Sequence, residues 1–215
     1  LGQDATGVWP LMTFGMAGFV AAVTVRELVK PAIVRMNSKG ESFVIAFVRT
    51  MESSRRRVGG YIVHMGVVIA FVAIAASSSY ATHTQATLSD GESFMVQNYR
   101  VELAGTQRGK EPHREFLAAN LRVSQDGEAP NLMQPRINFY ERSTDPIGTP
   151  AVWSLPQGDV YLSLLAYSAE NKTATINAWF FPLVGWLWML IPMFALGTLI
   201  AIWPARKREA TVVTA

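Results

Sequence analysis

The chain has 215 residues, of which 50% are hydrophobic and 16% are charged, and its mean hydropathy is +0.19. Since about a quarter of the residues in a soluble domain carry charge, this composition excludes an ordinary soluble protein and indicates a membrane protein. With no cysteine, the chain cannot contain a disulfide framework, a thiolate metal site or a cysteine-based covalent haem attachment motif. The chain begins at Leu1 and not at Met, so we expect a processed product, a fragment or one product of a split gene.

Three uncharged segments are each long enough to cross a bilayer. They have 21, 19 and 25 residues and cover 5–25, 58–76 and 179–203, and a crossing helix needs about 20 apolar residues. We therefore predict transmembrane helices over 1–25, 58–78 and 178–204. For the third helix, Trp179, Phe180 and Phe181 are interpreted as an aromatic belt at one end and Trp203 as its counterpart at the other.

The distribution of charge predicts the orientation of these spans. Residues 26–57 hold eight basic and three acidic side chains, whereas residues 79–177 hold eight basic and eleven acidic ones. The tail 205–215 adds three more basic residues, Arg206, Lys207 and Arg208. The positive-inside rule then places 26–57 and the tail in the cytoplasm and 79–177 on the periplasmic side of a bacterial inner membrane. Because the basic residues lie where membrane anchors belong, we expect membrane lipid as a partner and no nucleic acid.

The predicted cytoplasmic segment 26–57 contains a signal for a short helix. Ser38 and Glu41 have the spacing of a capping box, and apolar side chains then recur at helical spacing from Phe43 to Met51. This pattern predicts an amphipathic helix on the inner membrane surface. Packing of the same helix against other helices of a larger complex is the alternative.

Residues 79–177 have the pattern of an all-β domain. Apolar residues alternate in five runs, which are 94–96, 99–103, 121–123, 137–139 and 160–164. Asp90-Gly91, Asp126-Gly127 and Gly158-Asp159 are typical of turns between strands. We predict a sandwich or barrel of six or seven strands, in a membrane protein of the α plus β class with its ~100-residue β-domain inserted between helices two and three. The domain carries no recognisable catalytic motif.

His64 is the strongest candidate for a functional residue, because an ionisable ring inside a membrane span is costly. It lies seven residues beyond Arg57, or roughly 10 Å into the bilayer at helical rise. Gly60 precedes it by one turn on the same face, where a missing side chain lets a flat group approach. His64 is therefore a candidate axial ligand of haem iron, with Gly60 in the cofactor site. The alternative is a histidine hydrogen-bonded between helices that pack at Gly60 and Gly66.

The other two histidines are weaker candidates for metal ligands. His83 follows the second span at its outer end, and His113 lies in a charged loop. A lone exposed histidine is usually only solvated, so neither is predicted to bind a metal.

Several short motifs, taken together, resemble the carboxy-terminal part of the CcmF family of cytochrome c-type biogenesis proteins. The likeness covers roughly residues 55–204, in the same order as in the family. The motifs are Gly59-Gly60 with His64-Met65-Gly66, then Leu88-Ser89-Asp90-Gly91-Glu92 with Tyr99, then Pro135-Arg136 with Tyr140, then 158–164, and finally 181–188 with Ala195-Leu196-Gly197.

This resemblance implies a role in cytochrome c maturation as part of a haem lyase, with His64 as one axial ligand of a haem b held in the membrane. The second ligand is expected in the amino-terminal part of the protein, so the chain alone is expected to be inactive. The partners implied are that amino-terminal part, CcmH-type and CcmI-type subunits, the CcmE haem chaperone and apocytochrome c. Two other functions stay open, namely a membrane-anchored β-domain acting as a scaffold or receptor, and a haem-handling protein of the ResB type.

Overall fold

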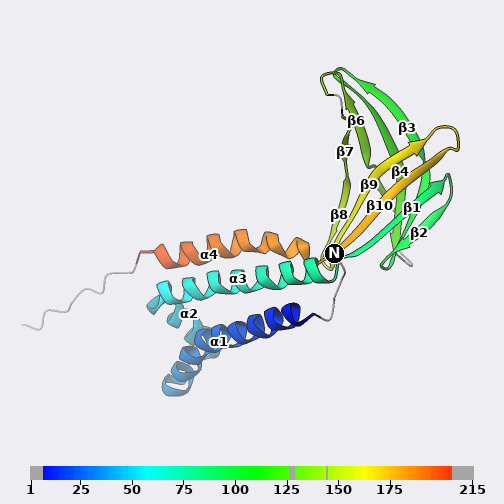
Figure 1. Cartoon of the computed structure of the whole chain (residues 1–215). Coiled ribbons are helices and arrows are strands. Elements are labelled where there is room, and N and C mark those ends of the chain that lie inside the picture. The colour runs from blue at the N-terminus through cyan, green and yellow to red at the C-terminus, as the bar shows by residue number, and fades with distance from the viewer. Residues whose placement is uncertain (1–6, 126–128, 144, 205–215) are drawn as a thin grey trace, which may run out of the picture. The chain divides into compact units, whose positions relative to one another are not determined.

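The structure, a computed structural model, describes residues 7–125, 129–143 and 145–204 (Figure 1). The chain divides into two compact units, and each is described separately below. Among the described residues, the helical unit gathers 7–72 with 186–204, and the β-unit holds 73–185. The predicted tail 205–215, with its three basic residues, and the predicted turn at Asp126-Gly127 lie outside the described residues.

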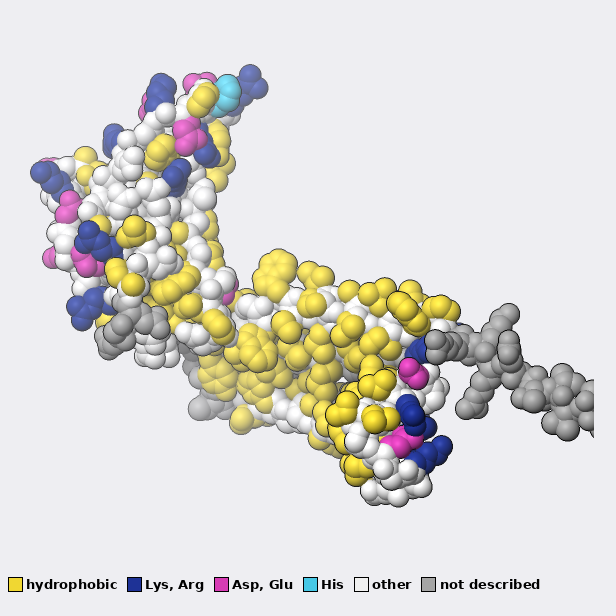
Figure 2. Space-filling view, turned by 180° about the vertical axis from the view of Figure 1, so that it is seen from behind, with side chains coloured by type: hydrophobic (Ala, Val, Ile, Leu, Met, Phe, Trp, Pro, Cys, Tyr) yellow, Lys and Arg dark blue, Asp and Glu magenta, His cyan; other side chains and the backbone are white. Residues whose placement is uncertain are grey.

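Five helical segments are present in the described chain. They are α1 (Val8–Lys39), α2 (Phe43–Ser53), α3 (Arg55–Ser79), the short 3-10 helix η1 (Val184–Met189) and α4 (Leu190–Ile202). Three stretches are long and apolar enough to cross a membrane, which are α1, α3 and η1 continued by α4. Figure 2 shows hydrophobic side chains along these helices, with the charged side chains gathered toward one end of the helical unit.

The first helix is longer than predicted, because α1 does not end at Val25 but continues to Lys39. At 1.5 Å per residue its 32 residues span about 48 Å, more than the roughly 30 Å of a hydrocarbon core. Charged residues after Val25 do not stop the helix, since Arg, Glu and Lys are good helix formers. It ends at Gly40, whose φ of 65° is the left-handed conformation that glycine adopts at helix termini.

The predicted capping box at Ser38 and Glu41 is wrong. Ser38 lies inside α1, where its hydroxyl donates to the carbonyl oxygen of Arg35. Glu41 accepts instead from Arg35 Nε at 2.9 Å and from Arg49 on α2, so its carboxylate ties the two helices together. The hydrogen bond from Arg35 is the main reason that the pKa of Glu41 is lowered. The helix expected at this point is present as α2, which buries Ala46 and Thr50.

Helices α3 and α4 approach each other closely at two glycines of α3, Gly59 and Gly66. A Cβ on Gly59 would collide with the carbonyl oxygen of Gly197 and would lie 2.9 Å from the Cβ of Ala201. About two helical turns further along α3, a Cβ on Gly66 would lie 3.2 Å from the Cβ of Met193. Small residues at such crossings let helix backbones approach closely inside a membrane. Gly59 and Gly66 therefore define the face of α3 that packs against α4.

The described residues of the β-unit form ten strands arranged in two antiparallel sheets (Figure 1). The first sheet has the order β1-β10-β9-β8, and the second has the order β2-β3-β4-β6-β7 with β5 paired to β4. Their bounds are β1 Thr82–Ser89, β2 Ser93–Val96, β3 Tyr99–Glu111, β4 Arg114–Gln125, β5 Asn131–Met133, β6 Arg136–Tyr140, β7 Ile147–Thr149, β8 Ala151–Leu155, β9 Gly158–Ser168 and β10 Thr173–Pro182.

One hydrophobic core is shared by the two sheets, which therefore pack face to face. Val101 and Leu121 from the second sheet and Leu162 and Ile176 from the first are at most 1% exposed in this cluster. All five apolar alternations noted in the sequence fall within strands. Phe139 in β6 is nevertheless 48% exposed, because the buried side chain of that short strand is the polar Asn138.

The predicted start of the third transmembrane helix is also wrong. Trp179, Phe180 and Phe181 belong to β10, which pairs with both β1 and β9 and ends only at Pro182. Buried and partly exposed residues alternate along this strand, with Ala178 and Phe180 facing the core. The uncharged run from 173 to 205 hides the boundary, since hydropathy alone does not separate a buried strand from a following helix.

Asp159, at the start of β9, gives the β-unit a predicted pH dependence. Its Oδ1 is buried without a hydrogen-bond partner, and burial raises the pKa of this carboxyl above 3.8, although Ser154 acts in the opposite direction. A carboxyl whose pKa is raised in the folded state does not lower the free energy of unfolding at a pH below its unfolded pKa. It lowers this free energy as the pH rises from the unfolded pKa through the folded pKa. The melting temperature of Asp159→Asn minus that of wild type should therefore be larger at pH 7 than at pH 4. A difference that is constant between these pH values would contradict this.

Candidate functional site

The ring of His64 is held by its own helix. Its Nδ1 lies 2.7 Å from the backbone carbonyl oxygen of Gly60, one turn earlier on α3. A carbonyl oxygen can only accept, so the proton of a neutral ring resides on Nδ1 and the lone pair on Nε2 remains free. This arrangement of one fixed nitrogen and one free nitrogen is the one that ligating histidines adopt.

His64 also lines an apolar cavity between α1 and α3. The cavity has a volume of about 430 Å³ and lies wholly within the helical unit. Its walls include Met16, Ala17 and Val20 from α1 and Val67 and Phe71 from α3. No Asp, Glu, Lys or Arg is among the described residues that line it, and His64 is their one ionisable side chain. A cavity of this size, with apolar walls and one nitrogen lone pair, suits a small molecule that is attached at one polar point.

The face of α3 that carries His64 differs from the face that packs on α4. His64 follows Gly59 by five residues, which is about 140° around a helix. Gly59 and Gly66 contact α4, whereas a Cβ on Gly60 would have no atom within 4 Å apart from those of its chain neighbours and of the adjacent backbone of α3. The glycines thus have different surroundings, and the open space at Gly60 lies one turn from His64.

The residues around His64 fit an axial ligand to haem iron. Such a ligand requires a nitrogen with a free lone pair, a partner that fixes the tautomer of the ring, and apolar surroundings. Nε2, the carbonyl of Gly60 and the cavity walls provide these features. A second histidine ligand is not available within the helices, because the chain's other two histidines, His83 and His113, belong to the β-unit. The role of His64 and Gly60 in binding a cofactor remains a prediction.

The two histidines of the β-unit have surroundings unlike that of His64. The ring of His83 stacks on Trp179 with centroids 4.1 Å apart, and its Nε2 is bonded to the side-chain oxygen of Asn177. His113 is exposed in the turn between β3 and β4. Among the residues that the structure describes, no group of three or more His, Cys, Asp or Glu side chains is placed to hold a metal ion.

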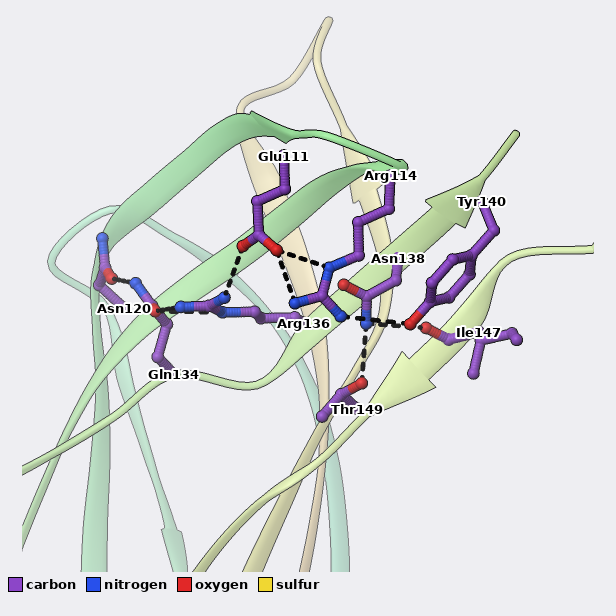
Figure 3. Close-up of polar contacts among 9 residues, drawn as sticks. All are labelled: Glu111, Arg114, Asn120, Gln134, Arg136, Asn138, Tyr140, Ile147 and Thr149. Carbon is purple, nitrogen blue, oxygen red and sulfur yellow. Dashed lines mark hydrogen bonds and ion pairs between the residues drawn. The ribbon is translucent and has the colours of Figure 1, made fainter. Parts of the chain in front are cut away.

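A polar cluster at one end of the second sheet was only partly visible in the sequence (Figure 3). The carboxylate of Glu111 accepts from Arg114 Nε at 2.8 Å and also pairs with Arg136, at 3.7 Å. Arg114 in turn donates to the hydroxyl of Tyr140 at 3.2 Å. Sequence motifs singled out Arg136 and Tyr140 but not Glu111 and Arg114, because the β3–β4 hairpin brings these residues to the β6 strand.

The same cluster continues across the strand ends through neutral side chains (Figure 3). Arg136 donates to Gln134 at 2.6 Å, and Gln134 donates to Asn120 at 2.7 Å. The guanidinium of Arg136 also lies 4.6 Å from the centroid of the Phe116 ring. Most of these groups are partly exposed and already paired, so the cluster orders this end of the sheet and offers no free nucleophile or base.

Known proteins are similar to this chain over both of its units. Residues 79–182 match the family model described as the CcmF C-terminal beta-sandwich. The chain is similar to the cytochrome c-type biogenesis protein CcmF of Haemophilus influenzae, with 24% identity over 206 residues, which are 96% of this chain and 30% of that protein. It is also similar to CcmF of Escherichia coli K12, with 23% identity over 68% of this chain and 22% of that protein.

A solved structure, that of the Cytochrome c Heme Lyase CcmF, has a related fold. Its TM-score is 0.61 at 21% sequence identity, and the match covers 85% of this chain and 34% of that one. The chain therefore spans less than a third of the length of the curated relatives and about a third of the solved structure.

Proposed function

These matches support the assignment of the chain to the CcmF family as a carboxy-terminal part, and from this premise we propose that it belongs to a haem lyase of cytochrome c maturation. In this proposal His64 is an axial ligand of a haem b held in the membrane. The β-unit contributes the surface on which partner proteins dock. The second axial ligand belongs to the amino-terminal part of the protein, which this chain does not include.

The observation that carries the proposal is the hydrogen bond between His64 and Gly60 at the wall of an apolar cavity. The Gly60 carbonyl, 2.7 Å from Nδ1, fixes the direction of the ring and makes Nε2 a better donor to iron. Apolar side chains of α1 and α3 line the cavity beside the ring, which is itself exposed and so open to a ligand. Haem b, when bound, supplies a one-electron redox centre, and this chain's residues bind and orient it.

The proposal also includes the side of the membrane on which each part of the chain lies. The β-unit lies on the periplasmic side of a bacterial inner membrane, and the segment around α2 lies on the cytoplasmic side, as the charge distribution indicates. The partners are then those of the family, namely CcmH-type and CcmI-type subunits, the CcmE haem chaperone and apocytochrome c. Attachment of haem to apocytochrome c requires the whole complex.

Replacement of His64 by alanine in the full-length protein tests this function in cells. We expect covalent haem in c-type cytochromes to fall at least about tenfold, since loss even of a residue that supports a metal ligand costs 10- to 100-fold. The measurement is haem staining of c-type cytochromes, with the amount of the variant protein determined in parallel.

His113→Ala is the matched control, because it removes an exposed histidine from a turn of the β-unit. It should leave the level of c-type cytochromes unchanged. Normal maturation with His64→Ala, at a normal amount of protein, would contradict the proposal and favour a scaffold function for the β-unit.

A further inference from the structure

Two adjoining cavities lie at the end of the helical unit where α3 begins and α4 ends. The first has a volume of about 720 Å³, and the second has a volume of about 530 Å³. They share Glu52, Arg55 and Trp203 in their walls, so they lie next to each other. Neither includes a residue of the His64 cavity, and both lie within one compact unit.

The first cavity is basic. Arg55, Arg56 and Arg57 line it, against Glu52 as its acidic residue. Arg55 bonds to the backbone carbonyl oxygens of Trp203 and Pro204 and so ties the end of α4 to the start of α3. Arg56 and Arg57 are exposed and take part in none of the ion pairs found among the described residues. The lining of this space, which is large enough for an anion, therefore includes two arginines without an ion-pair partner in the described chain.

The second cavity is apolar apart from the two charged residues that it shares with the first. Its walls are Val48 and Met51 from α2 and Leu196, Leu199 and Ile200 from α4, closed by Trp203. These residues leave a groove between helices that no apolar side chain of the described chain fills. An alkyl chain would bury apolar surface there, which the hydrophobic effect favours.

The position of both cavities along the helices matches a membrane surface. The α3 helix begins at Arg55 and α4 ends at Ile202, and both belong to stretches apolar enough to cross a membrane. Tryptophan at such a helix end lies at the level of lipid headgroups. A basic cavity at that level, joined to an apolar groove directed along a membrane helix, has the two parts of a phospholipid site.

We propose that the two cavities together bind one anionic phospholipid. Its phosphodiester group pairs with Arg56 and Arg57 in the first cavity, and one acyl chain lies along Leu196 and Leu199 in the second. The charge of the first cavity selects anionic over zwitterionic headgroups, because a choline group would add a further cation beside the arginines. The apolar groove selects a lipid over a free phosphate ion, which would leave the groove uncovered.

Native mass spectrometry of the full-length protein, delipidated in detergent, tests this site with phosphatidylglycerol as the probe. We expect one tightly bound phosphatidylglycerol per protein in wild type and about 30-fold weaker binding in Arg56→Gln/Arg57→Gln. That factor corresponds to about 1 kcal/mol for each basic residue near an anionic membrane surface. The control is Arg26→Gln/Lys30→Gln, which removes two exposed charges from α1 outside both cavities and should leave binding unchanged.

Competition and a second variant separate the lipid from other anions. Leu199→Trp, which fills the apolar groove, should weaken phosphatidylglycerol binding while leaving Arg56 and Arg57 in place. Phosphatidylcholine and millimolar inorganic phosphate should not displace the lipid. Equal losses in the two double variants, or no loss in Arg56→Gln/Arg57→Gln, would overturn the proposal. Displacement by inorganic phosphate, or unchanged binding in Leu199→Trp, would also overturn it by showing a simple anion site.

Discussion

The His64→Ala variant of the full-length protein should lose the b-type haem signal from its absorption spectrum. Removal of the ring takes away the nitrogen donor and leaves the Gly60 carbonyl and an apolar cavity, neither of which replaces an axial ligand. The haem content of the purified protein, measured as the reduced-minus-oxidised difference spectrum, should fall at least about tenfold. This is the largest effect expected of any single substitution in the chain.

The control for this loss is a histidine that does not face the cavity. His113→Ala should retain the complete spectrum, because His113 is exposed in a turn of the β-unit. A b-type spectrum that is unchanged in His64→Ala would show that His64 is a packing residue. The proposed function would then lose the observation on which it rests.

Leu162→Ala should destabilise the β-unit by about 2–5 kcal/mol, the cost of deleting a large side chain from a packed core. Leu162 is 0% exposed in the middle of β9 and belongs to the core that both sheets share. Its strand neighbours are Ala151 and Ala178, whose small side chains do not fill the resulting cavity. For a unit of this size, the melting temperature of the full-length protein in detergent should fall by about 8 °C or more.

Leu132→Ala is the matched control for the core substitution. Leu132 is 76% exposed, so its truncation should change the free energy of unfolding by no more than about 0.5 kcal/mol. A loss for Leu162→Ala that is no larger than the loss for Leu132→Ala would contradict the packing described for the two sheets.

Much of the architecture could be predicted because it depends on hydropathy and strand periodicity. The three apolar stretches and the β-domain between the second and third of them are present in the structure. The resemblance to CcmF is confirmed by the family match over 79–182. His64 could be singled out because an imidazole ring is conspicuous within an uncharged span, whatever its partners are.

Other features could not be predicted because they depend on tertiary contacts. Glu41 fits a capping box by spacing, but Arg35 and Arg49 on two helices compete successfully for its carboxylate. Trp179 fits an aromatic belt, but pairing with β1 and β9 extends the β-unit past it. Gly59 was noted only as part of a motif, although its contact with Gly197 on α4 is what orients that face of α3.

The most direct test of iron ligation by His64 is an imidazole titration of the His64→Gly protein reconstituted with haem, followed by absorption spectroscopy. Free imidazole fits the space left by the deleted ring and supplies the same donor nitrogen at the wall of the cavity. We predict that the low-spin b-type spectrum, absent in the variant, returns as imidazole is added. A His64→Gly protein that keeps its spectrum without imidazole, or that never regains it with imidazole, would contradict a ligand role for His64.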